Sequence, residues 1–222
     1  TLASADGQVA AINADTGADL WRVNVGQKLS AGVGSDGKWA AVVTEDGNLV
    51  ALTQGKEMWR KRLPARVYTA PLVAGERIFV QSADRSVQAF DAASGQALWS
   101  QAKTSEALVL RQSGVLTAYQ DTLVAGVSGR FVGIDPNTGA LRWEVPIASP
   151  RGTNDVERLV ELVGGVSRQG SVLCTRAYQM AVGCIDAATA QLSWTVRADG
   201  INSISGDAEV VAGHIQAHRS AA

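Results

Sequence analysis

Short segments of alternating apolar and polar residues follow one another along most of this chain. Examples are "GNLVAL" at 47–52 and "RSVQAF" at 85–90, and further short strands are indicated by "WAAVVTE" at 39–45 and "RIFVQSA" at 77–83. A period of two places alternate side chains on opposite faces of a β-strand, and the Gly and Asp residues between the segments favour turns. Helical periodicity is essentially absent. The pattern therefore predicts an all-β fold of short antiparallel strands.

A corner motif recurs after these strands and ends each time in tryptophan. Its Asp can accept backbone N–H bonds from the turn, and its Gly takes the positive φ that the turn needs. The Trp then opens the next strand. The five copies are "AINADTGADLW", "VALTQGKEMW", "AFDAASGQALW", "GIDPNTGALRW" and "CIDAATAQLSW", ending at Trp21, Trp59, Trp99, Trp143 and Trp194.

The repeat length indicates the architecture. Each unit holds about four short strands in roughly 40 residues, which is typical of a β-propeller blade. We therefore expect residues 1–222 to form a single β-propeller domain of four-stranded antiparallel blades. About five blades are represented, and because a propeller closes to remove its edges, the domain is expected to be incomplete.

The recurring tryptophan has two interpretations, a structural wedge between neighbouring sheets or a platform on which a ligand stacks. A ring that recurs in every unit rarely serves one site, so the structural role is favoured. In that role the indole N–H is expected to find a carbonyl oxygen.

Two blades carry insertions. The corner tryptophans are 38 residues apart from Trp21 to Trp59 and 40 from Trp59 to Trp99, but 44 from there to Trp143 and 51 from there to Trp194. The extra residues fall at 103–114 and 148–165, each after the strand that opens with Trp, so both are expected on one face of the ring.

These insertions are the strongest functional signal in the sequence, because apolar side chains beside Arg on long loops are typical of protein–protein hot spots. The alternative is that the leucines pack under their own blades. The first insertion contains Leu108, Leu110 and Arg111, and the second contains Arg158, Leu159, Glu161 and Leu162.

Composition and charge argue against several other functions. Twenty Lys and Arg against 21 Asp and Glu leave a net charge of −1, so nucleic acid is not an expected partner. No apolar run is long enough for a membrane-spanning helix, and no signal peptide is visible. His214 and His218 are the only histidines and lie in a terminal tail, so neither a Ser/His/Asp triad nor a metal site is expected.

Cys174 and Cys184 are the only cysteines. The segment "SVLCTRAYQMAVGCID" at 171–186 reads as a hairpin that sets them opposite one another. Two alternatives stay open, a cross-strand disulfide and two small buried apolar residues.

The corner motif resembles the tryptophan-docking repeat of the pyrroloquinoline-quinone dehydrogenase propellers. Those enzymes pair the repeat with vicinal cysteines, a calcium site and a catalytic Asp. No Cys-Cys pair occurs here, so no cofactor is expected, although a quinone-dependent dehydrogenase remains the alternative from another class.

Within this repeat class the chain resembles the BamB family of the outer-membrane β-barrel assembly (BAM) complex. The resemblance rests on "SADGQVAAINADTGADLWRVNVG", "LVLR" and "DVERLVEL". It implies an eight-bladed, non-catalytic lipoprotein scaffold on the periplasmic face of the Gram-negative outer membrane. The lipid anchor would lie outside this sequence.

The same resemblance implies the partner and its contacts. The partner is a POTRA domain of BamA, with unfolded outer-membrane proteins as a further candidate. Leu108, Leu110 and Arg111 match the family's Leu-x-Leu-Arg contact. The family's acidic pair falls on Glu161 and Val163, of which only Glu161 is acidic.

Overall fold

The computed structural model describes residues 1–101, 110–149, 160–198, 201–206 and 210–215, and these residues form strands and turns with no helix. The strands are β1 (Leu2–Ala3), β2 (Gln8–Ile12), β3 (Asp19–Asn24), β4 (Gly34–Ser35), β5 (Ala40–Val43), β6 (Asn48–Thr53), β7 (Lys56–Arg62), β8 (Leu72–Ala74), β9 (Arg77–Gln81), β10 (Val87–Asp91), β11 (Ala97–Gln101), β12 (Leu116–Tyr119), β13 (Thr122–Val127), β14 (Arg130–Ile134), β15 (Leu141–Pro146), β16 (Leu162–Gln169), β17 (Val172–Ala177), β18 (Ala181–Asp186), β19 (Gln191–Arg197), β20 (Ile201–Gly206) and β21 (Val211–Ile215).

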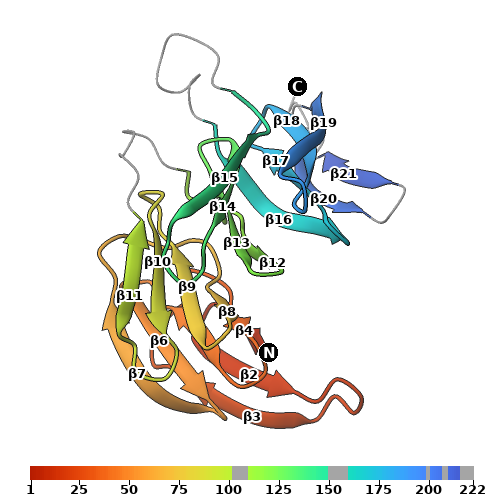
Figure 1. The fold of residues 1–222 in the computed structure, drawn as a ribbon. Coiled ribbons are helices and arrows are strands. Elements are labelled where there is room, and N and C mark those ends of the chain that lie inside the picture. The colour runs from red at the N-terminus through yellow and green to blue at the C-terminus, as the bar shows by residue number, and fades with distance from the viewer. Residues whose placement is uncertain (102–109, 150–159, 199–200, 207–209, 216–222) are drawn as a thin grey trace, which may run out of the picture. The chain divides into compact units, whose positions relative to one another are not determined.

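Consecutive strands pair into antiparallel meanders (Figure 1). Four strands each form the sheets β4–β7, β8–β11, β12–β15 and β16–β19, while β1–β3 form a three-stranded sheet and β20–β21 a hairpin. The sheets β1–β3, β4–β7 and β8–β11 belong to one compact unit, Thr1–Arg111 with Pro136–Ala140. The sheets β12–β15 and β16–β19 and the hairpin β20–β21 belong to a second unit, Gln112–Asp135 with Leu141–Ala222. The all-β prediction is confirmed, whereas one domain over residues 1–222 stays a prediction.

The corner motif has the turn chemistry that its sequence predicts. The Asp91 carboxylate accepts the backbone N–H of Ser94 at 2.7 Å and also its hydroxyl at 2.7 Å. These hydrogen bonds lower the pKa of Asp91. Asp186 accepts the backbone N–H of Ala188 at 2.9 Å, and its pKa is lowered mainly for that reason. The corners at Asp91 and Asp186 are thus held by their carboxylates, whereas in the first corner the Asn13 side-chain oxygen accepts the N–H groups of Asp15 and Thr16.

Each corner tryptophan sits at a β-bulge. In the sheet β4–β7, Trp59 pairs with Ala51, and the register then shifts by one residue between Ala51 and Leu52. The same shift occurs beside the tryptophan in the other four sheets that carry one. A bulge bends and twists the outer strand, so the shift helps to aim the ring away from its own sheet.

In the first unit, these rings pack on the corner of the following sheet. The Trp59 indole N–H donates to the Ala92 carbonyl oxygen at 2.8 Å, and that of Trp99 donates to Pro136 at 3.0 Å. The expected wedge with a bonded indole is therefore confirmed for these two rings. The corner glycine lies under the ring in three cases: Trp21 lies over Gly55, Trp59 over Gly95 and Trp99 over Gly139.

The corner glycine is required by this packing as well as by its φ. Gly95 has φ 72°, and a Cβ there would lie 2.8 Å from Trp59 Cδ2. We expect Gly95→Ala to destabilise the protein by about 3 kcal/mol, the sum of left-handed strain and an overpacked contact. Urea denaturation followed by circular dichroism measures this loss.

Gly17 provides the matched control, because it has φ 69° in the equivalent corner but no atom within 4 Å of a Cβ. Gly17→Ala should cost only the backbone strain, about 1 kcal/mol. Equal losses for the two variants would contradict the role of the ring.

Each unit has apolar cores between its sheets. In the first unit, the largest fully buried side chains include Leu49, Leu52 and Ile78. In the second unit, the fully buried side chains of the core include Phe131, Leu162, Leu173 and Ile185. The central strands β13 and β14 are buried along nearly their whole length, as expected for strands covered on both faces.

Candidate protein-docking site

The predicted partner-binding residues fall at the ends of the two insertions. Leu108 lies outside the described residues. Leu110 is half-buried and Arg111 is exposed, at the end of the first unit. In the second unit Glu161 is half-buried, whereas the Val163 side chain is only 2% exposed. This burial argues against a direct contact between the Val163 side chain and a partner.

The C-terminal ends of both insertions are joined to one another. We call residues 112–115 the first stem, which leads into β12, and residues 160–164 the second stem, whose last three residues begin β16. The Gly164 N–H donates to the Ser113 carbonyl oxygen at 2.7 Å, and Gly114 forms an antiparallel bridge with Val163. The sequence predicts that both insertions lie on one face of the propeller ring. The structure adds that the two stems are hydrogen-bonded neighbours in the second unit.

Buried apolar residues anchor the stems in the core of the second unit. Val115, Val160 and Leu162 are each at most 2% exposed and belong to one cluster with Phe131. The interpretation of Leu162 as a residue presented on the loop surface is therefore wrong, because its side chain packs under the blade. The sequence could have shown this, since Val160 and Leu162 alternate with the acidic Glu161 as in a strand.

Glu161 points away from this core. It lies between two buried residues in the chain, and its carbonyl oxygen accepts the Tyr178 N–H at 2.9 Å. The main chain of Glu161 is thus held by the turn after β17, and the residue as a whole is half-buried.

Arg176 is a functional candidate that the sequence analysis missed. It lies on β17, pairs with Val163 of β16 and is only 8% exposed. Its Nη2 donates to Gln112 Oε1 of the first stem at 3.4 Å, a long bond. Burial lowers the pKa of its guanidinium. No run of charge marks Arg176 in the sequence, so only the fold shows that it lies beside both stems.

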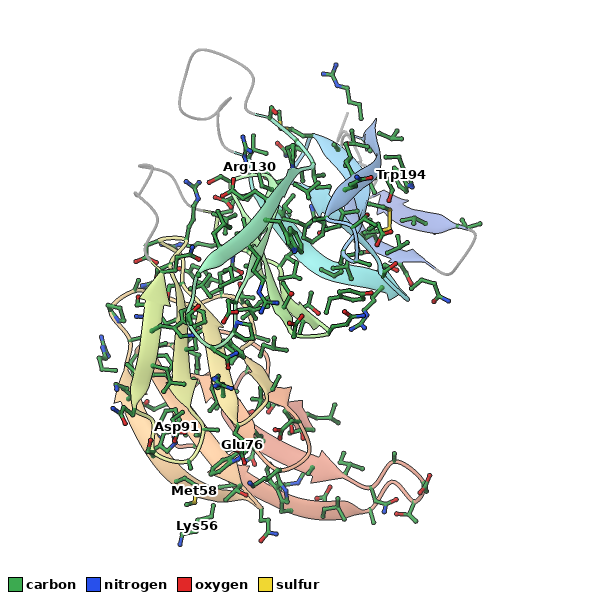
Figure 2. The ribbon with its side chains drawn as sticks, in the orientation of Figure 1. Lys56, Met58, Glu76, Asp91, Arg130 and Trp194 are labelled. Atoms are coloured by element: carbon green, nitrogen blue, oxygen red, sulfur yellow. A yellow bond between two sulfur atoms is a disulfide. The ribbon has the colours of Figure 1, made fainter. Side chains whose placement is uncertain are left out.

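The two cysteines are set opposite one another in the centre of the same sheet. Cys174 on β17 pairs with Cys184 on β18, which confirms the expected hairpin register. The structure joins them in a disulfide with an S–S distance of 2.06 Å, visible as a yellow bond in Figure 2. Both are buried, so this bridge lies inside the blade.

Across the described ranges, no three His, Cys, Asp or Glu side chains gather in a way that could hold a metal ion. His214 lies on β21, and His218 lies outside the described residues. The described part of the chain contains no helix of the length and apolarity needed to cross a membrane.

A family model described as outer membrane protein assembly factor BamB matches residues 5–220. BamB of Bordetella pertussis is 36% identical over 83% of this chain and 48% of its own length. BamB of Burkholderia pseudomallei is 33% identical over 96% of this chain and 56% of its own length. The chain thus spans about half the length of these relatives.

Solved structures agree on the fold. The crystal structure of BamB from Moraxella catarrhalis matches with a TM-score of 0.83 and 22% identity, over 94% of this chain and 64% of that one. A quinohemoprotein alcohol dehydrogenase from Comamonas testosteroni matches with a TM-score of 0.63 and 14% identity, over 87% of this chain and 37% of that one. At such identities these likenesses show the fold alone. They confirm the β-propeller prediction.

Proposed function

The chain belongs to the BamB family of outer membrane protein assembly factors, and we propose that it serves as a non-catalytic docking scaffold in that assembly. Its partner in this proposal is a POTRA domain of BamA. The location is the periplasmic face of the outer membrane, with a lipid anchor supplied outside this sequence. A quinone-dependent dehydrogenase is not favoured, because the relatives that match by sequence are assembly factors.

The joined stems are the observation that carries this proposal. They rest on the buried core of the second unit and are joined to one another by the Gly164–Ser113 hydrogen bond and the Gly114–Val163 bridge. A preorganised base reduces the conformational entropy that binding would otherwise cost. The exposed Arg111 directly precedes the first stem, and Glu161 lies within the second.

We assign distinct roles to the side chains. Leu108 and Leu110 bury against an apolar groove of the POTRA domain and provide most of the affinity. Arg111 pairs with a carboxylate or carbonyl oxygen of the partner, and Glu161 pairs with a cation. Val163 acts indirectly, because its main chain bridges Gly114 and so holds the second stem in place.

The double variant Arg111→Ala, Glu161→Ala tests this docking. We expect its dissociation constant for the POTRA domains of BamA to rise about tenfold or more, since truncating paired charges at an interface centre typically costs over 1 kcal/mol. Isothermal titration calorimetry measures the change, and circular dichroism checks that the β-structure is kept.

A control double variant, Lys56→Ala, Asp15→Ala, removes one charge of each sign from exposed positions of the first unit. Its affinity should equal that of the unaltered protein. Equal binding by the test and control variants would overturn the docking role of the insertions.

A further inference from the structure

Arg176 lies beside the place where the two stems join. Its strand partner is Val163 of the second stem, and its Nη2 reaches Gln112 of the first. All of these residues belong to the second unit. The guanidinium is therefore positioned by both stems, although neither stem supplies it with a carboxylate in the described part of the chain.

The guanidinium is incompletely bonded. Arg176 Nε is buried and makes no hydrogen bond, and the one bond of Nη2, to a neutral amide oxygen, is 3.4 Å long. A buried charge without a hydrogen-bonded counter-charge is unfavourable in general. Arg176 is thus a strong donor whose capacity the described residues do not fully use.

Glycine follows Val163 at the part of β16 that lies beside this donor. A Cβ on Gly164 would lie 3.4 Å from Arg176 Nε and 3.8 Å from Nη2, so at this position only backbone lies against the guanidinium. A Cβ on the neighbouring Gly165 would meet no atom within 4 Å. Neither glycine therefore places a side chain beside Arg176, and a small group needs only a shift of backbone or of flexible side chains to reach Nε.

A carboxylate matches this site in charge, shape and donor geometry. The Nε and Nη2 hydrogens of a guanidinium point in parallel and bind the two oxygens of a carboxylate side by side. The Gln112 amide group adds a neutral donor next to them. Binding would supply the counter-charge that the guanidinium lacks.

We propose that Arg176 and Gln112 form a receptor for an Asp or Glu side chain of the docking partner, inserted where the two stems join. The proposal rests on the docking function proposed above and adds the chemistry of the residue that the partner presents. It adds Arg176 to the contacts proposed above for Arg111 and Glu161.

The test compares Arg176→Met with Arg197→Met in the full chain. Both variants remove one positive charge, but Arg197 is exposed on β19. We expect Arg176→Met to weaken binding of the BamA POTRA domains at least tenfold, and Arg197→Met to change it less than twofold. The urea midpoint of Arg176→Met should stay equal or rise, because an unpaired buried charge is replaced by an apolar chain of similar length.

A second measurement works without the partner. Replacing sodium chloride by sodium acetate at constant ionic strength should shift the Arg176 Nε–H resonance in a ¹H–¹⁵N spectrum, with the signal assigned by its loss in Arg176→Met. An unchanged resonance would overturn the receptor, as would Arg176→Met binding the POTRA domains like the unaltered protein. A fall in urea midpoint with unchanged affinity would show a structural role instead and also overturn it.

The experiments distinguish a failure of the proposed docking function from a failure of the carboxylate receptor at Arg176. If the unaltered protein does not bind the POTRA domains, the proposed docking function fails, while an acetate-dependent shift would still support a carboxylate receptor at Arg176. If the unaltered protein binds and Arg176→Met binds equally well, docking stands and the receptor fails.

Discussion

We expect Trp59→Ala to lower the free energy of unfolding by about 3 kcal/mol, the lower end of the range for large aromatic truncations. The half-buried ring packs on Gly95 of the next sheet, and its N–H bonds the Ala92 carbonyl oxygen. Truncation would leave a cavity between two sheets and remove that bond. Urea denaturation monitored by circular dichroism gives the change, with the denaturant slope checked for constancy.

Trp194 is the matched control for this loss. It takes the same position at the β-bulge, paired with Cys184, but it is 40% exposed on β19 (Figure 2). Trp194→Ala should therefore cost less than about 1 kcal/mol. If both variants lost the same stability, the ring would contribute within its own sheet and not through docking on the next corner.

We expect Gly126→Ala to destabilise the second unit by about 3 kcal/mol and to weaken binding of the BamA POTRA domains. Gly126 lies on β13, and a Cβ there would come within 2.8 Å of Leu162 Cβ and 2.9 Å of Val115 Cβ. Neither contact can relax by a rotamer change, because both atoms are attached to the stem backbones. Overpacking of this kind costs 1–3 kcal/mol in general, and here it would push the two stems apart.

Urea denaturation and calorimetric titration with the POTRA domains measure the two effects of Gly126→Ala. Gly165→Ala is the control for stability, since a Cβ at Gly165 meets no atom within 4 Å. It should change the free energy of unfolding by no more than about 0.5 kcal/mol. An unchanged stability of Gly126→Ala would contradict the close packing of the stems against β13.

The blades could be predicted from the sequence because the corner motif repeats. A corner such as "AFDAASGQALW" combines a turn acid, a left-handed glycine and a ring, and each of these acts within a few residues of its own position. The hairpin around Cys174 and Cys184 was predictable for the same reason. The docking of Trp59 on Gly95 joins consecutive repeats, so the regular spacing also predicted that kind of contact.

The candidate site was only partly predictable. Unequal spacing of the tryptophans located both insertions and with them Leu110, Arg111 and Glu161. It could not separate exposed from buried residues inside an insertion. The Leu162 side chain belongs to the core because it packs against Gly126 of a neighbouring sheet. These two residues lie far apart in the sequence, so no local pattern predicts their contact.

The sequence alone therefore determined the all-β fold, the blade repeat, the corner chemistry and the two insertions, since local patterns and their spacing carry this information. Only the tertiary structure decided that the two stems are hydrogen-bonded to one another, that Val163 is buried, and that Arg176 lies against Gln112. Arg176 and Gln112 are 64 positions apart. Such contacts form only when whole sheets pack together. The periodicity of the sequence therefore does not predict which polar side chain becomes buried.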